Sequence, residues 1–369
     1  MSDQAQPISQ LATVTSQAAR LLIVRLGALG DVLHALPAVT ALRELYPNAA
    51  IGWVIEERWA ELLCAPSAPR CGKRSPGRPL VDAVHIVNTH EWRRSLFSPA
   101  TWKSAWGTVR EIRSASYQAA IDFQGAIRSA ILARLSGAVE VYGFIQPREN
   151  AASMFYTRQV QVSGKHVIAQ NLALAGAVAK QHLEMTPVEM PVDAEAEHRV
   201  AERLQDLAFK PYIVLNPGAG WGAKQWPVDR YGQVARILAQ QTGLLSLINF
   251  GPGEEALACA TEASSAGTAK AITTSISELI ALIRRARLVI GGDTGPVHLA
   301  AMLGIPVVAI FGPTDPARNG PIGAATIVLR KKSSETSYKR IRHSEAGLLK
   351  IAVDEVLGAA IQLLEDNRD

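Results

Sequence analysis

Short continuous apolar runs alternate with longer amphipathic segments along most of the chain. Residues 20–26 form an apolar run typical of a buried strand, and residues 31–46 follow with a hydrophobic stripe at helical spacing. Further along, an apolar run at 51–55 predicts a strand, and a strand at 119–123 precedes a helix at 127–135. Strands that alternate with helices predict parallel sheets joined by crossover helices.

The second half of the chain repeats this alternation after a linker that Pro187 and Pro191 mark. We therefore predict an α/β protein with two Rossmann-like domains, whose parallel sheets face each other across a cleft. The predicted divisions are a flexible tail at 1–19, an N-terminal domain at 20–188, a C-terminal domain at 189–347, and a last helix at 348–369 that packs back on the N-terminal domain.

Composition narrows the class of protein further. A chain of 369 residues is long enough for two domains, and its net charge of +5 suits an anionic ligand or a membrane surface. Three cysteines without metal-ligand spacing indicate a reducing compartment. The sequence has no apolar run long enough to span a bilayer and no signal-peptide pattern, so we expect a cytoplasmic protein.

The most informative motif is the turn from Gly291 to Gly295, between an apolar strand and a helix. The first amides of a helix have no partner inside it and point outward with the positive end of the helix dipole. Thr294 adds a hydroxyl, Gly295 allows close approach to the backbone, and His298 lies about one turn further on. We predict a nucleotide diphosphate site here, although His298 can equally be a packed or capping residue.

Two more loops follow strands in the C-terminal half. Residues 216–227 are rich in glycine and contain Lys224. Such a loop can bind phosphate, or it can be a surface loop with a solvated lysine. Residues 251–255 open a helix with Glu254 and Glu255. One of these carboxylates can accept hydrogen bonds from a ribose, or both can simply favour the positive end of the helix dipole.

The first strand ends in a turn at residues 27–30 that lacks the Gly-x-Gly-x-x-Gly fingerprint of dinucleotide-binding proteins. Asp31 follows this turn at the start of a helix, where ligands of α/β sheets bind. It can cap the helix, or it can act as a general base that takes a proton from a sugar hydroxyl.

Three motifs taken together resemble glycosyltransferase family nine, the ADP-heptose:lipopolysaccharide heptosyltransferases. They are LGALGDVLH at 26–34, KQWP at 224–227, and DTGPVHLAA at 293–301 leading to FGPTDP at 311–316. Within the family, the heptosyltransferase I group is the most similar. That similarity rests on WRR at 92–94, DFQGAIRSA at 122–130 and RENAASMFY at 148–156.

The resemblance implies a GT-B fold, in which the N-terminal domain binds the acceptor and the C-terminal domain binds the sugar nucleotide. It implies an inverting transfer of heptose from ADP-heptose to the Kdo of lipid A, with no metal and no cofactor. Asp31 becomes the catalytic base and Lys224 the group that steadies the leaving ADP. The implied donor site also contains Asn216, Gly218, Glu254 or Glu255, Asp293, Thr294, Gly295 and His298.

The acceptor would be an anionic lipid at the cytoplasmic face of the inner membrane, so we expect peripheral membrane contact and no nucleic-acid partner. Arginine binds carboxylates and phosphates through two parallel hydrogen bonds. The predicted acceptor residues are Trp92, Arg93, Arg94, Gln124 and Arg128. A solvated surface is the alternative for each of these basic and aromatic side chains.

Three other functions stay open from the sequence. A family member can use another nucleotide sugar or a later core acceptor. A protein of the same fold can bind nucleotide sugars without catalysis. A nicotinamide-dependent oxidoreductase is disfavoured by the missing fingerprint and by the second predicted sheet.

Overall fold

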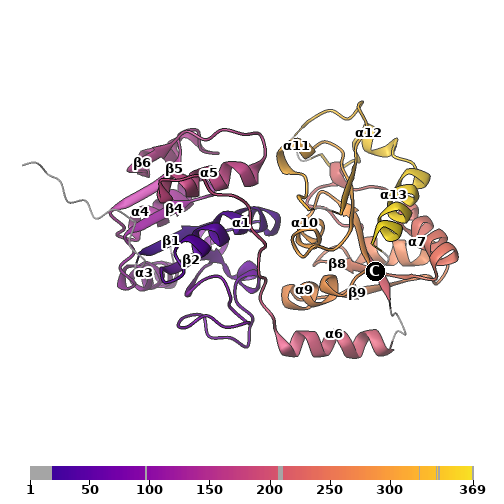
Figure 1. Ribbon diagram of the computed structural model, residues 1–369, viewed down its shortest axis with the longest axis horizontal. Coiled ribbons are helices and arrows are strands. Elements are labelled where there is room, and N and C mark those ends of the chain that lie inside the picture. Colours follow the sequence, from indigo (N-terminus) through magenta and orange to yellow (C-terminus); the bar gives the residue numbers. More distant parts are fainter. Residues whose placement is uncertain are drawn as a thin grey trace, which may run out of the picture.

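The computed structural model describes residues 19–95, 98–206, 211–323, 325–337, 339 and 341–367. Within them the chain forms two sheets of six strands, in the orders β3-β2-β1-β4-β5-β6 and β12-β11-β10-β7-β8-β9. Neighbouring strands are parallel in both sheets, for example β1 with β2 and β7 with β10. Figure 1 shows the two halves side by side, so the predicted α/β architecture with two parallel sheets is confirmed.

The N-terminal sheet contains β1 (Arg20–Val24), β2 (Ala50–Glu56), β3 (Ala83–Val87), β4 (Ala119–Asp122), β5 (Glu140–Phe144) and β6 (Arg158–Val160). Its helices are α1 (Leu29–Leu45), α2 (Thr89–Arg94), α3 (Pro99–Ser114), α4 (Ile127–Leu135) and α5 (Val167–Ala179), with 3-10 turns η1 (Glu57–Leu62) and η2 (Asn150–Phe155). Apolar residues of α1 and α5 cover one face of this sheet, and those of α3 and α4 cover the other.

The C-terminal sheet contains β7 (Tyr212–Asn216), β8 (Leu245–Phe250), β9 (Ala269–Thr273), β10 (Leu288–Gly292), β11 (Val307–Ile310) and β12 (Thr326–Leu329). Its helices are α6 (Ala194–Asp206), α7 (Val228–Thr242), α8 (Glu255–Ser264), α9 (Ile276–Arg284), α10 (Gly295–Met302), α11 (Pro316–Asn319), α12 (Ala346–Leu349) and α13 (Val353–Asp366), with the 3-10 turn η3 (Gly222–Lys224). Figure 1 shows α6 running beneath this half of the molecule.

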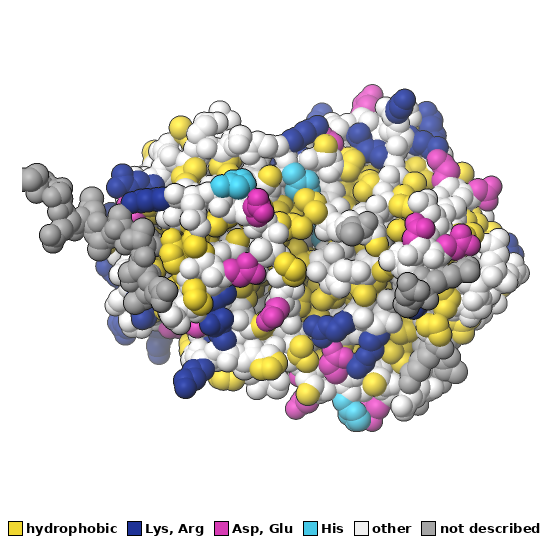
Figure 2. Space-filling model, in the orientation of Figure 1, with side chains coloured by type: hydrophobic (Ala, Val, Ile, Leu, Met, Phe, Trp, Pro, Cys, Tyr) yellow, Lys and Arg dark blue, Asp and Glu magenta, His cyan; other side chains and the backbone are white. Residues whose placement is uncertain are grey.

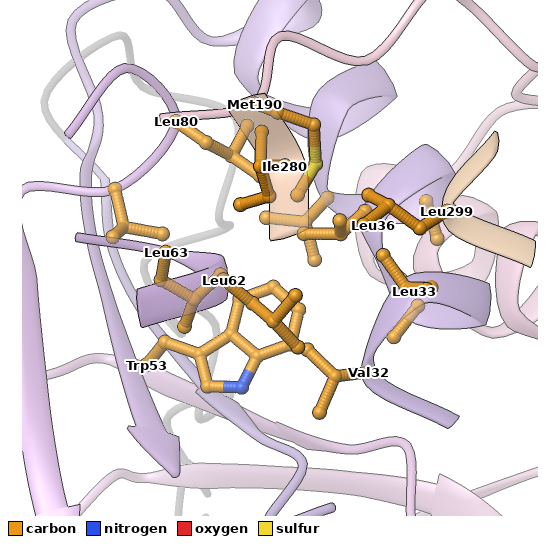
Figure 3. Close-up of a cluster of buried hydrophobic side chains, with 14 of the residues drawn as sticks. Val32, Leu33, Leu36, Trp53, Leu62, Leu63, Leu80, Met190, Ile280 and Leu299 are labelled. Atoms are coloured by element: carbon orange, nitrogen blue, oxygen red, sulfur yellow. The ribbon is translucent and has the colours of Figure 1, made fainter. Parts of the chain in front are cut away.

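An apolar core joins the two halves. Leu33 and Leu36 of α1 lie beside Leu299 of α10 in Figure 3, and Ile280 of α9 belongs to the same buried cluster. α1 is therefore buried both against its own sheet and against the facing domain. Since burial of apolar surface drives association, this core holds the two domains in contact.

The predicted packing of residues 348–369 on the N-terminal domain is wrong for their described part. The apolar side chains of α13, among them Val356 and Leu363, pack with Val234 of α7 in the core of the C-terminal domain. Helical periodicity shows that one face is buried but does not show against which sheet. Of the predicted tail at 1–19, residues 1–18 lie outside the described residues.

Candidate active site between the two domains

Asp31 lies in the first turn of α1, just beyond the carboxyl end of β1. Its Oδ2 accepts a hydrogen bond from the backbone N–H of Ala28 at 3.2 Å, and its Oδ1 lies 2.9 Å from Nη2 of Arg25. The side chain is nevertheless 39% exposed. The carboxylate therefore caps its helix and also remains within reach of a molecule in solution.

The turn before Asp31 is fixed by buried side chains. A Cβ on Gly27 would lie 2.5 Å from Nε1 of Trp59, so only glycine fits at this position. Arg25 is buried and its guanidinium also donates to the carbonyl of Phe123. The backbone N–H of Leu26 donates to Oε1 of Gln124 at 2.9 Å. These contacts hold the Asp31 carboxylate in one place.

In the C-terminal domain, Lys224 and Asp293 form a buried ion pair. Nζ of Lys224 lies 2.5 Å from Oδ2 of Asp293 and 4.2 Å from the ring centre of Trp221. Nε2 of His298 lies 3.0 Å from the other carboxylate oxygen of Asp293. Burial opposes the charge on Asp293, but the hydrogen bond from His298 and the charge of Lys224 outweigh it and hold the pKa of this carboxyl well below its usual range.

A histidine from the facing domain extends this chain of contacts. Nε2 of His34, on α1, lies 3.3 Å from Nδ1 of His298, on α10. Burial, and then the neighbouring His298 and His166, lower the pKa of His34 well below its usual value. The His34 imidazole is therefore neutral at pH 7. Side-chain contacts therefore run without a break from Lys224 through Asp293 and His298 to His34, and they cross the boundary between the two domains.

The other predicted donor residues gather around the ends of β7 and β8. The Asn216 side chain is buried and donates to Oγ1 of Thr294 at 3.3 Å, while its Oδ1 accepts from Asn249 at 3.0 Å. A Cβ on Gly218 would lie 2.3 Å from both Cδ and Oε1 of Glu254, so this carboxylate lies directly against the glycine loop. Glu255 instead is exposed, and its Oε1 accepts from the N–H of Gly253 at 3.2 Å.

The predicted anion turn faces α1 of the other domain. A Cβ on Gly295, the first residue of α10, would lie 2.1 Å from Cδ2 of Leu29, and one on Gly30 would lie 3.4 Å from Cδ2 of His298. The residues just before Asp31 thus touch the turn that starts α10. Thr294 and Gly295 keep partial exposure on their remaining side.

The predicted acceptor residues fall into two groups. Arg93, Arg94 and Arg128 are exposed at the N-terminal domain, and Trp92 is half-buried against its core. Partial burial and the neighbouring charge of Arg93 lower the pKa of Arg128, so these two guanidinium groups are close in space. Gln124 is buried, and its contact with Leu26 supports the turn before Asp31.

Sequence reasoning missed Arg25, His34 and His166 as parts of this site. His34 lies inside the LGALGDVLH motif, three residues after Asp31, so the motif itself contained the signal. The apolar periodicity around His34 predicted only a helix that packs in the core. Local periodicity could not show that a second domain also covers this helix. His166 precedes α5, and its Nε2 lies 2.9 Å from the carbonyl oxygen of Gly320 in the other domain.

Among the described residues, no three histidine, cysteine, aspartate or glutamate side chains lie together in a way that suits a metal ion. No helix in the same part of the chain has the length and apolar character needed to cross a membrane.

Two facing Rossmann-like domains, with an exposed carboxylate in one and a lysine and a helix N-terminus in the other, have the arrangement of a GT-B glycosyltransferase. The family model "Glycosyltransferase family 9 (heptosyltransferase)" matches residues 106–348. The chain belongs to this family.

Individual proteins that are similar to this chain are named as heptosyltransferases. Lipopolysaccharide heptosyltransferase 1 of Pseudomonas aeruginosa is 28% identical over 84% of this chain and 83% of its own length. The structure of Escherichia coli heptosyltransferase WaaC with ADP has a TM-score of 0.74, with 27% identity over 94% of this chain and 99% of its own. WaaC with ADP-2-deoxy-2-fluoro heptose has a TM-score of 0.71 at 26% identity, over 94% of this chain and 99% of its own.

Proposed function

We propose that this glycosyltransferase moves heptose from ADP-heptose to the Kdo of lipid A, with inversion at the anomeric carbon. One observation carries the proposal. Leu29 and Gly30, the two residues before Asp31, lie against Gly295 and His298 of the facing domain. An acceptor hydroxyl at Asp31 and a donor diphosphate at the start of α10 are therefore brought together at one boundary.

In the proposed reaction, Asp31 takes the proton of the attacking Kdo hydroxyl. The hydroxyl oxygen forms a bond to the anomeric carbon of heptose as the bond from that carbon to the diphosphate breaks. ADP leaves with the electron pair of the broken bond. Arg25, whose Nη2 lies 2.9 Å from Oδ1 of Asp31, holds this carboxylate in its orientation before the proton arrives.

Lys224 and the amides at the start of α10 supply the charge that the leaving ADP needs. We propose that the Lys224 ammonium, which lies against Asp293 in this structure, turns to the diphosphate when the donor binds. The lysine ammonium and the unpaired helix amides, once placed against the diphosphate, stabilise the departing ADP, and this proposed step uses no metal.

Glu254 is the better candidate for the ribose. Its carboxylate lies against Gly218 in the donor loop, whereas Glu255 is exposed at the first turn of α8. The relative WaaC binds ADP and a fluorinated ADP-heptose, which supports an adenine nucleotide at this position.

On the acceptor side, we propose that Arg93, Arg94 and Arg128 bind the carboxylates and phosphates of Kdo-lipid A, with Trp92 beside them. Gln124 supports the acceptor side indirectly, because its Oε1 accepts a hydrogen bond from the backbone N–H of Leu26. The acceptor is a lipid, so the proposed place of work is the cytoplasmic face of the inner membrane.

The test is incubation of the full-length protein with ADP-heptose and Kdo-lipid A, followed by mass spectrometry of the lipid. The proposal predicts a single added heptose and release of one ADP for each heptose transferred. Parallel reactions with another nucleotide sugar, and with an acceptor that already carries heptose, define the specificity. Consumption of only one of those alternatives would contradict the proposed donor or acceptor.

A further inference from the structure

Two large aromatic side chains are exposed on α3. Trp102 and Trp106 have 55% and 56% of their surface exposed. They are separated by four residues and therefore lie one above the other on the same helix face. One turn further along α3, Val109 and then Ile112 are buried in the core of the N-terminal domain. More than half of each indole therefore remains accessible at the surface of α3.

The surroundings of the pair are positively charged. Residues 89–114 contain the five basic residues Arg93, Arg94, Lys103, Arg110 and Arg113 against the two acidic residues Glu91 and Glu111, a net charge of +3. Glu111 is engaged by His85, whose Nδ1 lies 2.6 Å from its Oε1. Figure 2 shows several Lys and Arg side chains at the end of the molecule where Figure 1 places α3. A face of this kind attracts an anionic surface.

The topology puts this face beside the predicted acceptor side. β3 ends at Val87, α2 follows directly, and α3 then runs back along the sheet to β4. The first half of α3, which carries both tryptophans, is therefore at the carboxyl end of the parallel strands. Asp31 follows β1 at the same end of the sheet.

We propose that this α3 face, formed by Trp102, Trp106, Lys103 and Arg110, docks the protein on an anionic lipid bilayer. The indole rings enter the boundary between headgroups and acyl chains, where tryptophan is favoured, and the basic side chains contact lipid phosphates. The inference deepens the proposed function, because docking there presents the Asp31 edge of the sheet to a lipid-linked acceptor. A protein surface is the competing occupant, and the experiment separates the two.

The test is cosedimentation of the full-length protein with vesicles of phosphatidylcholine alone, or with about 30% phosphatidylglycerol added. The wild-type protein binds the anionic vesicles and not the neutral ones, and raising the salt from about 0.1 M to about 0.5 M weakens the binding. The double variant Trp102→Ser/Trp106→Ser binds at least about tenfold more weakly, since two large apolar surfaces no longer enter the bilayer.

Val139→Ser is the matched control. Val139 is 68% exposed and directly precedes β5, which lies next to the edge strand β6, whereas β3 forms the other edge of this sheet. It should bind vesicles as the wild type does. Thermal unfolding checks that each variant is folded, and all variants should transfer heptose at the wild-type rate to an acceptor without acyl chains.

Equal vesicle binding by the double variant and the wild type would overturn the docking face, as would equal binding to neutral and anionic vesicles. Self-association that depends on concentration, is lost in the double variant and occurs without vesicle binding would assign the face to a protein partner instead. Vesicle binding does not require catalysis. A wild-type protein that binds anionic vesicles but transfers no heptose would therefore leave this surface standing and remove the proposed function.

Discussion

His34 and His298 meet across the domain boundary with Nε2 and Nδ1 3.3 Å apart and their ring centres 4.5 Å apart. His298 also faces Oδ1 of Asp293 through its Nε2, so that nitrogen donates to the carboxylate. In a neutral His298 the Nδ1 atom then accepts, and Nε2 of His34 donates to it. The N-terminal domain is thereby linked to the carboxylate that pairs with Lys224.

This contact predicts a loss of stability in mild acid. His34 is buried, and its pKa in the folded protein lies well below its ordinary value of 6.5, while the unfolded chain takes up a proton near pH 6.5. The free energy of unfolding should therefore be greatest above pH 6.5 and fall as the pH drops towards 5. The slope from His34 approaches about 1.4 kcal/mol per pH unit.

Chemical denaturation of the wild type and of His34→Gln between pH 8 and pH 5 checks this prediction. The variant should be less stable throughout but should show a clearly smaller decrease on acidification. The groups that face His34 are His298, His166, Asp293 and Arg25, and burial also lowers the pKa of His166, so His166→Gln should remove a further part of the slope. The exposed His198 provides the control variant, and an identical slope in His34→Gln and the wild type would refute the assignment.

Lys224 should matter for both the reaction and the fold. Lys224→Met removes the proposed ligand of the diphosphate, and kcat/KM should fall by about 10²- to 10³-fold, the usual cost of losing one such group. The variant also leaves the buried Asp293 carboxylate without its lysine partner, although His298 still contacts it, so the free energy of unfolding should drop by about 3 kcal/mol.

A double-mutant cycle with Asp293→Asn separates the two effects of Lys224. The double variant should recover most of the lost stability, because no unpaired buried charge remains, yet it should stay inactive. Lys270→Ala, which breaks an exposed pair with Glu262, is the control for removal of a lysine charge. Stability that is not recovered in the double variant would speak against the ion pair as the cause.

Glu254 and Glu255 offer a matched pair of adjacent residues. Glu254→Gln should raise the KM for ADP-heptose by about tenfold or more, since a charged acceptor of a ribose hydroxyl is replaced by a neutral one. Glu255→Gln should change this KM little. Steady-state kinetics at saturating acceptor give both values, and the reverse ranking would place the ribose at Glu255.

The fold could be predicted from the sequence wherever the signal was local. The helix predicted at 127–135 is observed as Ile127–Leu135. Ser275 and Glu278 have the sequence spacing of a capping box, and the N–H of Glu278 does donate to the Ser275 hydroxyl at 3.2 Å. Continuous apolar strands predicted the parallel sheets because both faces of such sheets are covered.

Contacts between distant segments could not be predicted in the same way. α1 was predicted from a single hydrophobic stripe, yet it is buried nearly all around because α10 of the other domain covers it. The approach of Leu29 to Gly295 and of His34 to His298 depends on how two domains dock, and no local spacing encodes this. The predicted packing of the last helix on the N-terminal domain was wrong for the same reason.

The central claim is that Asp31 removes the acceptor proton opposite a donor site that does not depend on it. Asp31→Asn preserves the size of the side chain and removes its basicity, so kcat should fall by about 10²- to 10⁴-fold. Calorimetric titration with ADP should give the wild-type affinity for the same variant. Transfer at the wild-type rate by Asp31→Asn would contradict the account.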